Sequence, residues 1–174
     1  MVTIVQKGDP ILRKTAKAVT KSMFGKPELK RIIRDMKKAI DSQDDAVAIA
    51  APQIGVSLRI FVVAGKIFEM LGQEKNGERK NKTDDVVFIN PEVIKLSRDK
   101  KEVEEGCLSV RYLYGKVKRS KKARVRALNE KGRPFEMGGT GLLAQIFQHE
   151  TDHLVGKLFI DSATEIENLP PEKI

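Results

Sequence analysis

The strongest indication of the fold is the stretch Gln148-His149-Glu150-Thr151-Asp152-His153-Leu154. It ends an apolar segment that lies between Gly138-Gly139-Thr140 and Gly156, and this segment predicts a helix of about 15 residues. Residues four apart share one face of a helix, so His149 and His153 can present ring nitrogens to one metal ion. They are the only two histidines in the chain. The pattern therefore predicts a metal site on a helix.

The remaining parts of this metal site have to come from other residues. A catalytic site of this kind has three protein ligands and an open position for water. The position six residues beyond His153, where some HExxH peptidases carry a third histidine, is Phe159. Two sources of a third ligand stay open: the thiolate of Cys107, the only cysteine, or a carboxylate from Glu165, Glu167 or Glu172. Glu150 follows the first histidine and can act as a general base toward the attacking water.

Hydrophobic periodicity elsewhere predicts one long helix and a series of strands. Pro27 opens the helix, whose apolar residues recur at helical spacing up to Ile40. Strands are predicted at 58–63, 86–89 (stopped by Asn90-Pro91), 103–110, 114–119, 122–128 and 133–137. Short connections favour antiparallel pairing, with the helices on one side. We expect an α+β fold, with antiparallel β-sheets packed around a central helix that carries the two histidines.

Length and composition indicate how many domains the chain forms and where in the cell it is expected. The 174 residues fit a single domain over 1–174, with a surface loop at 66–85 and a short tail at 162–174. Apolar residues make up 40% of the chain, no stretch is long enough to cross a membrane, and the N-terminus lacks a signal-peptide pattern. We therefore expect a cytoplasmic protein without a membrane segment. A single cysteine leaves no partner for an internal disulfide.

Three segments, in this order, resemble the signature motifs of the peptide deformylase family. The segment 46–53, Ala-Val-Ala-Ile-Ala-Ala-Pro-Gln, resembles the first motif, G-φ-G-φ-A-A-x-Q. The segment 105–109, Glu-Gly-Cys-Leu-Ser, resembles the second, and the segment 148–154 resembles the third. Weaker similarity extends over nearly the whole chain, at 9–13, 89–91 and 156–161.

The resemblance implies a bacterial-type deformylase, which hydrolyses the formyl group from the N-terminal formylmethionine of nascent polypeptides. It implies one divalent metal ion, Fe(II) in cells and Zn(II) or Ni(II) in preparations, with the ligands Cys107, His149 and His153. Glu150 would move a proton from water to the departing amine. The side-chain amide of Gln53 and the backbone N–H of Leu108 would stabilise the oxyanion.

The resemblance also implies a set of substrate-binding residues, and the sequence departs from the family pattern among them. The set is Val47, Ala48, Gly106, Leu142, Gln145 and Ile146. Ala46 and Ala48 replace two glycines in a segment that pairs with the bound peptide in the family, which bears on peptide affinity. Gln145 is polar where an apolar residue is usual in the methionine pocket. Its amide either lies at the pocket rim or changes the preference for the first residue.

Other functions stay open at this point. A silent relative could bind peptide N-termini without catalysis, and a metallopeptidase could use the same helix with a carboxylate as third ligand. The net charge of +9 fits attraction to a ribonucleoprotein surface, or only solvated lysines. Because few residues follow Asp161, ribosome contact would depend on basic surface at Lys116, Lys118, Arg119, Lys121 and Lys122. The sequence leaves the physiological metal and the oligomeric state undetermined.

Overall fold

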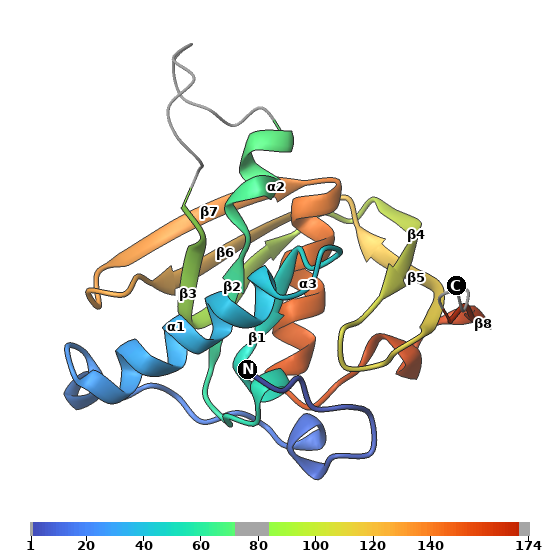
Figure 1. Ribbon diagram of the computed structural model, residues 1–174. Coiled ribbons are helices and arrows are strands. Elements are labelled where there is room, and N and C mark those ends of the chain that lie inside the picture. Colours follow the sequence, from blue (N-terminus) through green and yellow to red (C-terminus); the bar gives the residue numbers. More distant parts are fainter. Residues whose placement is uncertain (1, 72–83, 171–174) are drawn as a thin grey trace.

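The chain folds into two antiparallel sheets and three α-helices in a computed structural model that describes residues 2–71 and 84–170 (Figure 1). The five-stranded sheet has the order β1-β2-β3-β6-β7, with bounds Ala48–Ala50, Ile60–Val63, Val86–Leu96, Lys122–Leu128 and Pro134–Thr140. The three-stranded sheet has the order β4-β5-β8, with bounds Lys100–Gly106, Leu113–Ser120 and Thr164–Asn168. The helices are α1 (Pro27–Asp41), α2 (Gly65–Met70) and α3 (Leu142–His153). The predicted α+β class is confirmed.

The two long helices pack on opposite faces of the five-stranded sheet, so the prediction that helices lie on one side was wrong. Alternate residues of β2 point to opposite faces. Phe61 joins Phe88 and Phe147 of α3 in one core cluster, and the Phe61 and Phe88 rings stack with centroids 4.4 Å apart. Ile60 packs in a second cluster with the apolar stripe of α1, which includes Met36. Because the strands are buried on both faces, β2 is a continuous run of apolar residues.

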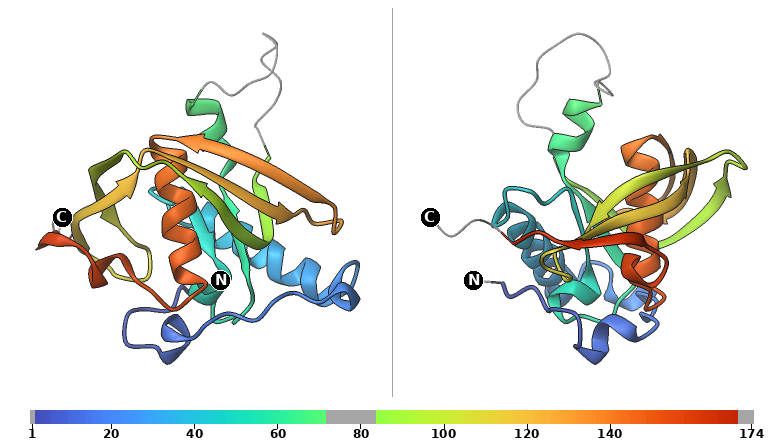
Figure 2. Two further views of the ribbon diagram at one scale, coloured as in Figure 1. Left: turned by 180° about the vertical axis from the view of Figure 1, so that it is seen from behind. Right: turned by 90° about the vertical axis from the view of Figure 1, so that its right-hand side faces the viewer.

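Helix α3 contacts strands of both sheets, as its position in Figures 1 and 2 shows. It follows Gly141, whose φ of 55° turns the chain out of β7. Three residues after the helix ends, the chain turns at Gly156, which has a φ of 75°. A Cβ at Gly156 would lie 2.5 Å from the Arg13 carbonyl oxygen, so only glycine fits there. The predicted helix is thus shorter in the structure, with twelve residues from Leu142 to His153.

Strand β3 continues through Asn90-Pro91, although these residues were predicted to stop it. Asn90 has a φ of 50° and the register shifts between Ile89 and Glu92, which is the geometry of a bulge. The Asn90 side chain bonds both the backbone N–H and the carbonyl of Val19, each at 2.8 Å. A proline is tolerated at such a point because the ladder needs no N–H there.

The segments expected to be a loop and a tail both contain regular structure. Helix α2 occupies 65–70 because Ile67 and Phe68 are buried, and Asp85 accepts a hydrogen bond from the Gly65 N–H at 2.9 Å. The rest of the expected loop, residues 72–83, lies outside the described residues. In the expected tail, β8 pairs with β5, while 171–174 are not described. The strand expected at 103–110 ends at Gly106, and the next four residues turn away from the sheet.

Candidate metal centre

Three donor atoms converge where the end of β4 meets α3. Cys107 directly follows β4, while His149 and His153 lie on one face of α3. The ligand atoms of the three residues all lie within 4.8 Å of one another. Cys107 Sγ and His153 Nε2 are 3.3 Å apart. This separation is smaller than the sum of typical metal–sulfur and metal–nitrogen bonds, about 2.3 and 2.0 Å, so one ion can bond both atoms.

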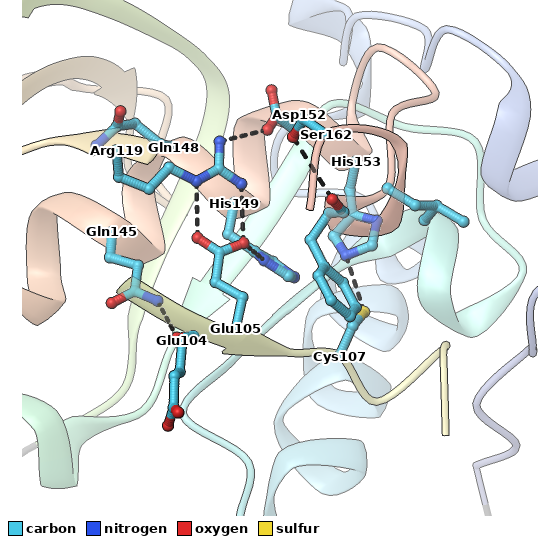
Figure 3. A network of polar contacts seen from close by, with 12 residues as sticks. Glu104, Glu105, Cys107, Arg119, Gln145, Gln148, His149, Asp152, His153 and Ser162 are labelled. Carbon is cyan, nitrogen blue, oxygen red and sulfur yellow. Dashed lines mark hydrogen bonds and ion pairs between the residues drawn. The ribbon is translucent and has the colours of Figure 1, made fainter. Parts of the chain in front are cut away.

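His149 is oriented by a buried ionic network (Figure 3). Its Nδ1 lies 3.0 Å from Glu105 Oε2. Arg119 donates to both oxygens of Glu105, at 2.7 and 2.9 Å, and to Asp152 at 2.6 Å. Burial alone would raise the pKa of Glu105, but the hydrogen bonds with Arg119 and His149 outweigh it and lower the pKa to about 2. A carboxylate at Nδ1 keeps the proton on that nitrogen, which leaves Nε2 free for a metal.

Two buried side-chain polar atoms lack a hydrogen-bond partner within residues 2–71 and 84–170, and both belong to this centre. They are Glu150 Oε2 and His153 Nδ1. Unpartnered buried polar atoms are costly, and they are expected where a substrate, an ion or water completes the site. Burial raises the pKa of Glu150 to about 7. A carboxyl group with that pKa can both accept and release a proton near neutral pH.

Gln53 is held with its amide nitrogen toward the centre. Its Oε1 accepts a hydrogen bond from the Ala50 N–H at 2.8 Å, which fixes the orientation of the amide. Its Nε2 lies 3.5 Å from Cys107 Sγ and 3.2 Å from Ser109 Oγ. Leu108 follows the cysteine and is almost fully buried. Two potential hydrogen-bond donors, the Gln53 amide and the Leu108 backbone, therefore lie beside the metal ligands.

A cavity of about 300 Å³ adjoins the centre and contains all six of the predicted substrate-binding residues in its lining: Val47, Ala48, Gly106, Leu142, Gln145 and Ile146. It lies between the first strand of the larger sheet and β4, and each of these is an edge strand of its sheet. The backbone of an edge strand can pair with an added chain. A Cβ at Gly106 would lie 2.6 Å from the Tyr114 ring, so any side chain there would force this ring to move.

Gln145 lines this cavity, but its amide is engaged elsewhere. Its Nε2 donates to the Glu104 carbonyl oxygen at 2.8 Å, as Figure 3 shows. The amide is therefore anchored on β4, and the aliphatic part of the side chain remains to form cavity wall. Of the two interpretations offered for Gln145, this geometry matches the one that places the amide at the rim.

Sequence reasoning missed the ionic network and a second ion pair at the cavity. Arg119 was assigned to the basic surface, yet its side chain is only 10% exposed and is enclosed by two carboxylates. The sequence did contain a signal for this burial. Glu105 and Asp152 lie close in sequence to Cys107 and His153 and become buried or partly buried with them, and a buried carboxylate requires a cation. At the cavity rim, Arg111 binds both oxygens of Asp45, at 2.6 and 3.0 Å. No sequence pattern indicated that Arg111 and Asp45 form an ion pair.

Comparisons with known proteins agree with this geometry. The family model described as polypeptide deformylase matches residues 1–169. The peptide deformylase of Desulforudis audaxviator is 40% identical over 163 residues, which cover 94% of each chain. A peptide deformylase from Legionella pneumophila is 40% identical with a TM-score of 0.77, covering 95% of this chain and 87% of that one. The class I type b peptide deformylase from Acinetobacter baumannii bound to Met-Ala-Ser is 30% identical with a TM-score of 0.78, covering 92% and 98%.

These matches extend over nearly the full length of the relatives and do not favour a silent relative over an enzyme. The family is metal-dependent, in agreement with the cluster of Cys107, His149 and His153. The chain therefore belongs to the polypeptide deformylase family and is a hydrolase that removes the formyl group from N-terminal formylmethionine.

Proposed function

We propose that Cys107, His149 and His153 bind one divalent metal ion, Fe(II) in cells and Zn(II) or Ni(II) in preparations. The observation that carries this assignment is the 3.3 Å approach of Cys107 Sγ to His153 Nε2, beside a His149 ring whose Nδ1 is already occupied. A soft thiolate with two imidazoles suits these ions. When bound, such an ion lowers the pKa of water and polarises a carbonyl oxygen.

Gln53 and Leu108 are assigned to the formyl oxygen. Attack on a formamide places negative charge on this oxygen, and fixed donors stabilise the charge without having to reorient. The Gln53 amide is held through its Oε1, so its NH₂ group stays directed at the centre. The Leu108 N–H is the second donor. Loss of one such donor typically costs about 3 kcal/mol of transition-state stabilisation.

Glu150 is assigned to proton transfer. Its side chain is buried beside the cavity, and its Oε2 has no partner among the described residues. The carboxylate accepts a proton from water as the water oxygen attacks the formyl carbon. It then donates this proton to the amine nitrogen as the carbon–nitrogen bond breaks, because an amide anion is a very poor leaving group. The products are formate and a peptide with a free amino group.

The substrate peptide is proposed to bind along the edge of β1, with its first side chain against Leu142, Gln145 and Ile146. The Acinetobacter baumannii relative with Met-Ala-Ser bound supports a short peptide as the ligand. Ala46 and Ala48 do not obstruct this mode through backbone strain, since the described non-glycine residues with positive φ are Asn90 and Glu165. Glycine is therefore not required at either position.

We also propose that the chain acts in the cytoplasm on nascent peptides, and that it contacts the ribosome through basic surface. No helix in the described ranges is both long and apolar enough to span a membrane. Arg119 is removed from the basic surface expected at 116–122, because it lies inside the ionic network. Lys116 and Lys121 form ion pairs with Glu165 and Asp99.

The decisive experiment is the release of formate from formyl-Met-Ala-Ser by protein that is purified without oxygen and loaded with Fe(II). We expect turnover by the wild type. We expect Cys107→Ser to lose most of its metal in elemental analysis, because a hydroxyl is a much weaker ligand than a thiolate. A Cys107→Ser protein that remains fully loaded would refute the ligand assignment and leave the activity standing. A loaded wild type without turnover would refute the function.

A further inference from the structure

A second cavity, of about 370 Å³, lies on the five-stranded sheet and shares no lining residue with the cavity at the metal centre. It is formed where β3, β6 and β7 run side by side, in the region seen in the left view of Figure 2. Its lining includes Lys95, Ser97, Lys122, Arg124, Gly138 and Thr140. This set, called the sheet groove below, combines three cations, two hydroxyls and a glycine.

Strand register places the three cations of the sheet groove together. In β6 the exposed residues Lys122 and Arg124 alternate with buried residues that face α3. Arg124 lies opposite Lys95 of β3 on one side and opposite Gly138 of β7 on the other. A Cβ at Gly138 would have Arg124 Nη2 as its nearest neighbour, at 3.9 Å. The missing side chain at Gly138 thus leaves open space along the cationic row.

The positive charge of the sheet groove is only partly neutralised. Glu136 lies 3.0 Å from Arg126 and 3.6 Å from Arg124, so its main partner is Arg126, outside the groove. Within 2–71 and 84–170, no ion pair involves Lys95 or Lys122. The groove therefore presents excess positive charge to an anionic partner.

We propose that the sheet groove binds the phosphate backbone of double-stranded RNA. Side chains two residues apart in a strand are about 6.6 Å apart, a separation of the same order as that between successive phosphates. None of the lining residues is aromatic, so stacking on unpaired bases is not available, and a duplex offers its backbone instead. The exposed hydroxyl of Thr140 can hydrogen-bond to a ribose 2′-hydroxyl, whereas the Ser97 hydroxyl already bonds the Asp99 carbonyl oxygen and the Lys122 N–H. The proposal does not depend on the assignments at the metal centre.

The test is fluorescence anisotropy of the full-length, metal-loaded protein with a labelled RNA duplex of about 16 base pairs. The triple variant Lys95→Gln, Lys122→Gln, Arg124→Gln should bind at least about tenfold more weakly. Each lost phosphate contact should reduce the slope of log K against log salt by about 1. A control with the same net charge, Lys30→Gln, Arg34→Gln, Lys38→Gln on the exposed face of α1, should change the affinity by less than about twofold.

A second variant separates the shape of the groove from its charge. Gly138→Leu keeps every cation and fills the open strip, and we expect it also to weaken RNA binding. Turnover of formyl-Met-Ala-Ser should be unchanged in all these variants, which verifies their folding. The proposal is overturned if the α1 control loses as much affinity as the groove variant, or if Gly138→Leu binds like wild type. Equal affinity for a DNA duplex or for polyglutamate would overturn the choice of RNA as the partner.

Discussion

The two walls of the cavity at the metal centre are built in opposite ways. The wall formed by β4 and α3, called the ionic wall below, is supported from behind by the ionic network: Glu105, Arg119 of β5 and Asp152 hold His149 through bonds of 2.6 to 3.0 Å. The wall formed by residues 46–48 is apolar: Ala46 and Ala48 are almost completely buried, and Val47 is partly buried. The ionic wall fixes the direction of individual atoms. The apolar wall offers an edge on which a peptide of any sequence can pair.

This difference predicts where the enzyme is sensitive to substitution. A change in the ionic wall alters the position or charge of a reacting group, so it should reduce activity by orders of magnitude. A change in the apolar wall alters packing by a methyl group or less, so it should have a small effect.

The largest effect is expected for Glu150→Gln. The substitution preserves size and hydrogen bonding but removes the group that carries the proton, so kcat should fall by at least about 10²-fold. Metal content and the binding of the product Met-Ala-Ser should stay at the wild-type level. Glu104→Gln is the matched control, an exposed glutamate of the same cavity, and should change kcat by less than about twofold. A Glu150→Gln enzyme with near wild-type turnover would exclude the proposed role.

The next effect is expected for Arg119→Met, which leaves Glu105 as a buried carboxylate without its cation. Breaking a buried ion pair in this way costs about 3–5 kcal/mol of unfolding free energy. Loss of the support behind a metal-binding histidine also weakens metal affinity about 10- to 100-fold. Urea unfolding and competition with a chelator measure the two quantities.

Arg126→Met serves as the control for the Arg119 substitution. Arg126 pairs with Glu136 on the surface, where the side chains are 57% and 38% exposed. Loss of an exposed pair should cost less than about 1 kcal/mol. If the two arginine variants are equally stable and bind metal equally well, the ionic wall has no special role.

Local sequence spacing predicted the two histidines, and the family resemblance added Cys107, but neither indicated the residues that support them. His149 and His153 are four residues apart, so helix geometry places them on one face. Cys107 was identified by the resemblance of the segment 105–109 to a family motif. Arg119 comes from β5, a strand separate in sequence from α3, and an arginine among lysines has the pattern of a solvated surface. Its burial is a consequence of tertiary packing, which periodicity does not encode.

The prediction of strands was limited in the same way, because sequence patterns indicate burial but not tertiary pairing. Apolar strands such as β2 were predicted because burial on both faces leaves a continuous hydrophobic run. Strand β8 was missed because all five of its residues are exposed and no alternation marks them. Strand β3 was predicted to end early because Asn90-Pro91 usually terminates a strand, whereas here a bulge and two hydrogen bonds to Val19 carry it onward.

In the apolar wall, the double variant Ala46→Gly, Ala48→Gly restores the glycines of the family pattern. Each glycine should lower the unfolding free energy by about 0.5–1 kcal/mol, because it has more backbone freedom to lose on folding. The value of kcat/KM for formyl-Met-Ala-Ser should stay within about threefold of wild type, since both alanines already have ordinary backbone geometry. Thermal or urea unfolding and steady-state kinetics measure these effects. A tenfold gain in kcat/KM would show instead that the methyl groups obstruct the peptide.

A similarly small effect is expected for Gln145→Ile, in the lining of the same cavity. The Gln145 amide donates to the Glu104 carbonyl oxygen, which leaves the methylenes of the side chain to form cavity wall. Isoleucine would add apolar surface of roughly one methylene, worth about 0.8 kcal/mol, and would release the Glu104 carbonyl to water. We expect kcat/KM to rise a few-fold for formyl-Met substrates, and not for analogues with a shorter or polar first residue. Gln145→Glu keeps the length but cannot donate to Glu104, so it should lower kcat/KM for every substrate. If Gln145→Ile changes all substrates by the same factor, Gln145 does not contact the first side chain and acts only by tying α3 to β4.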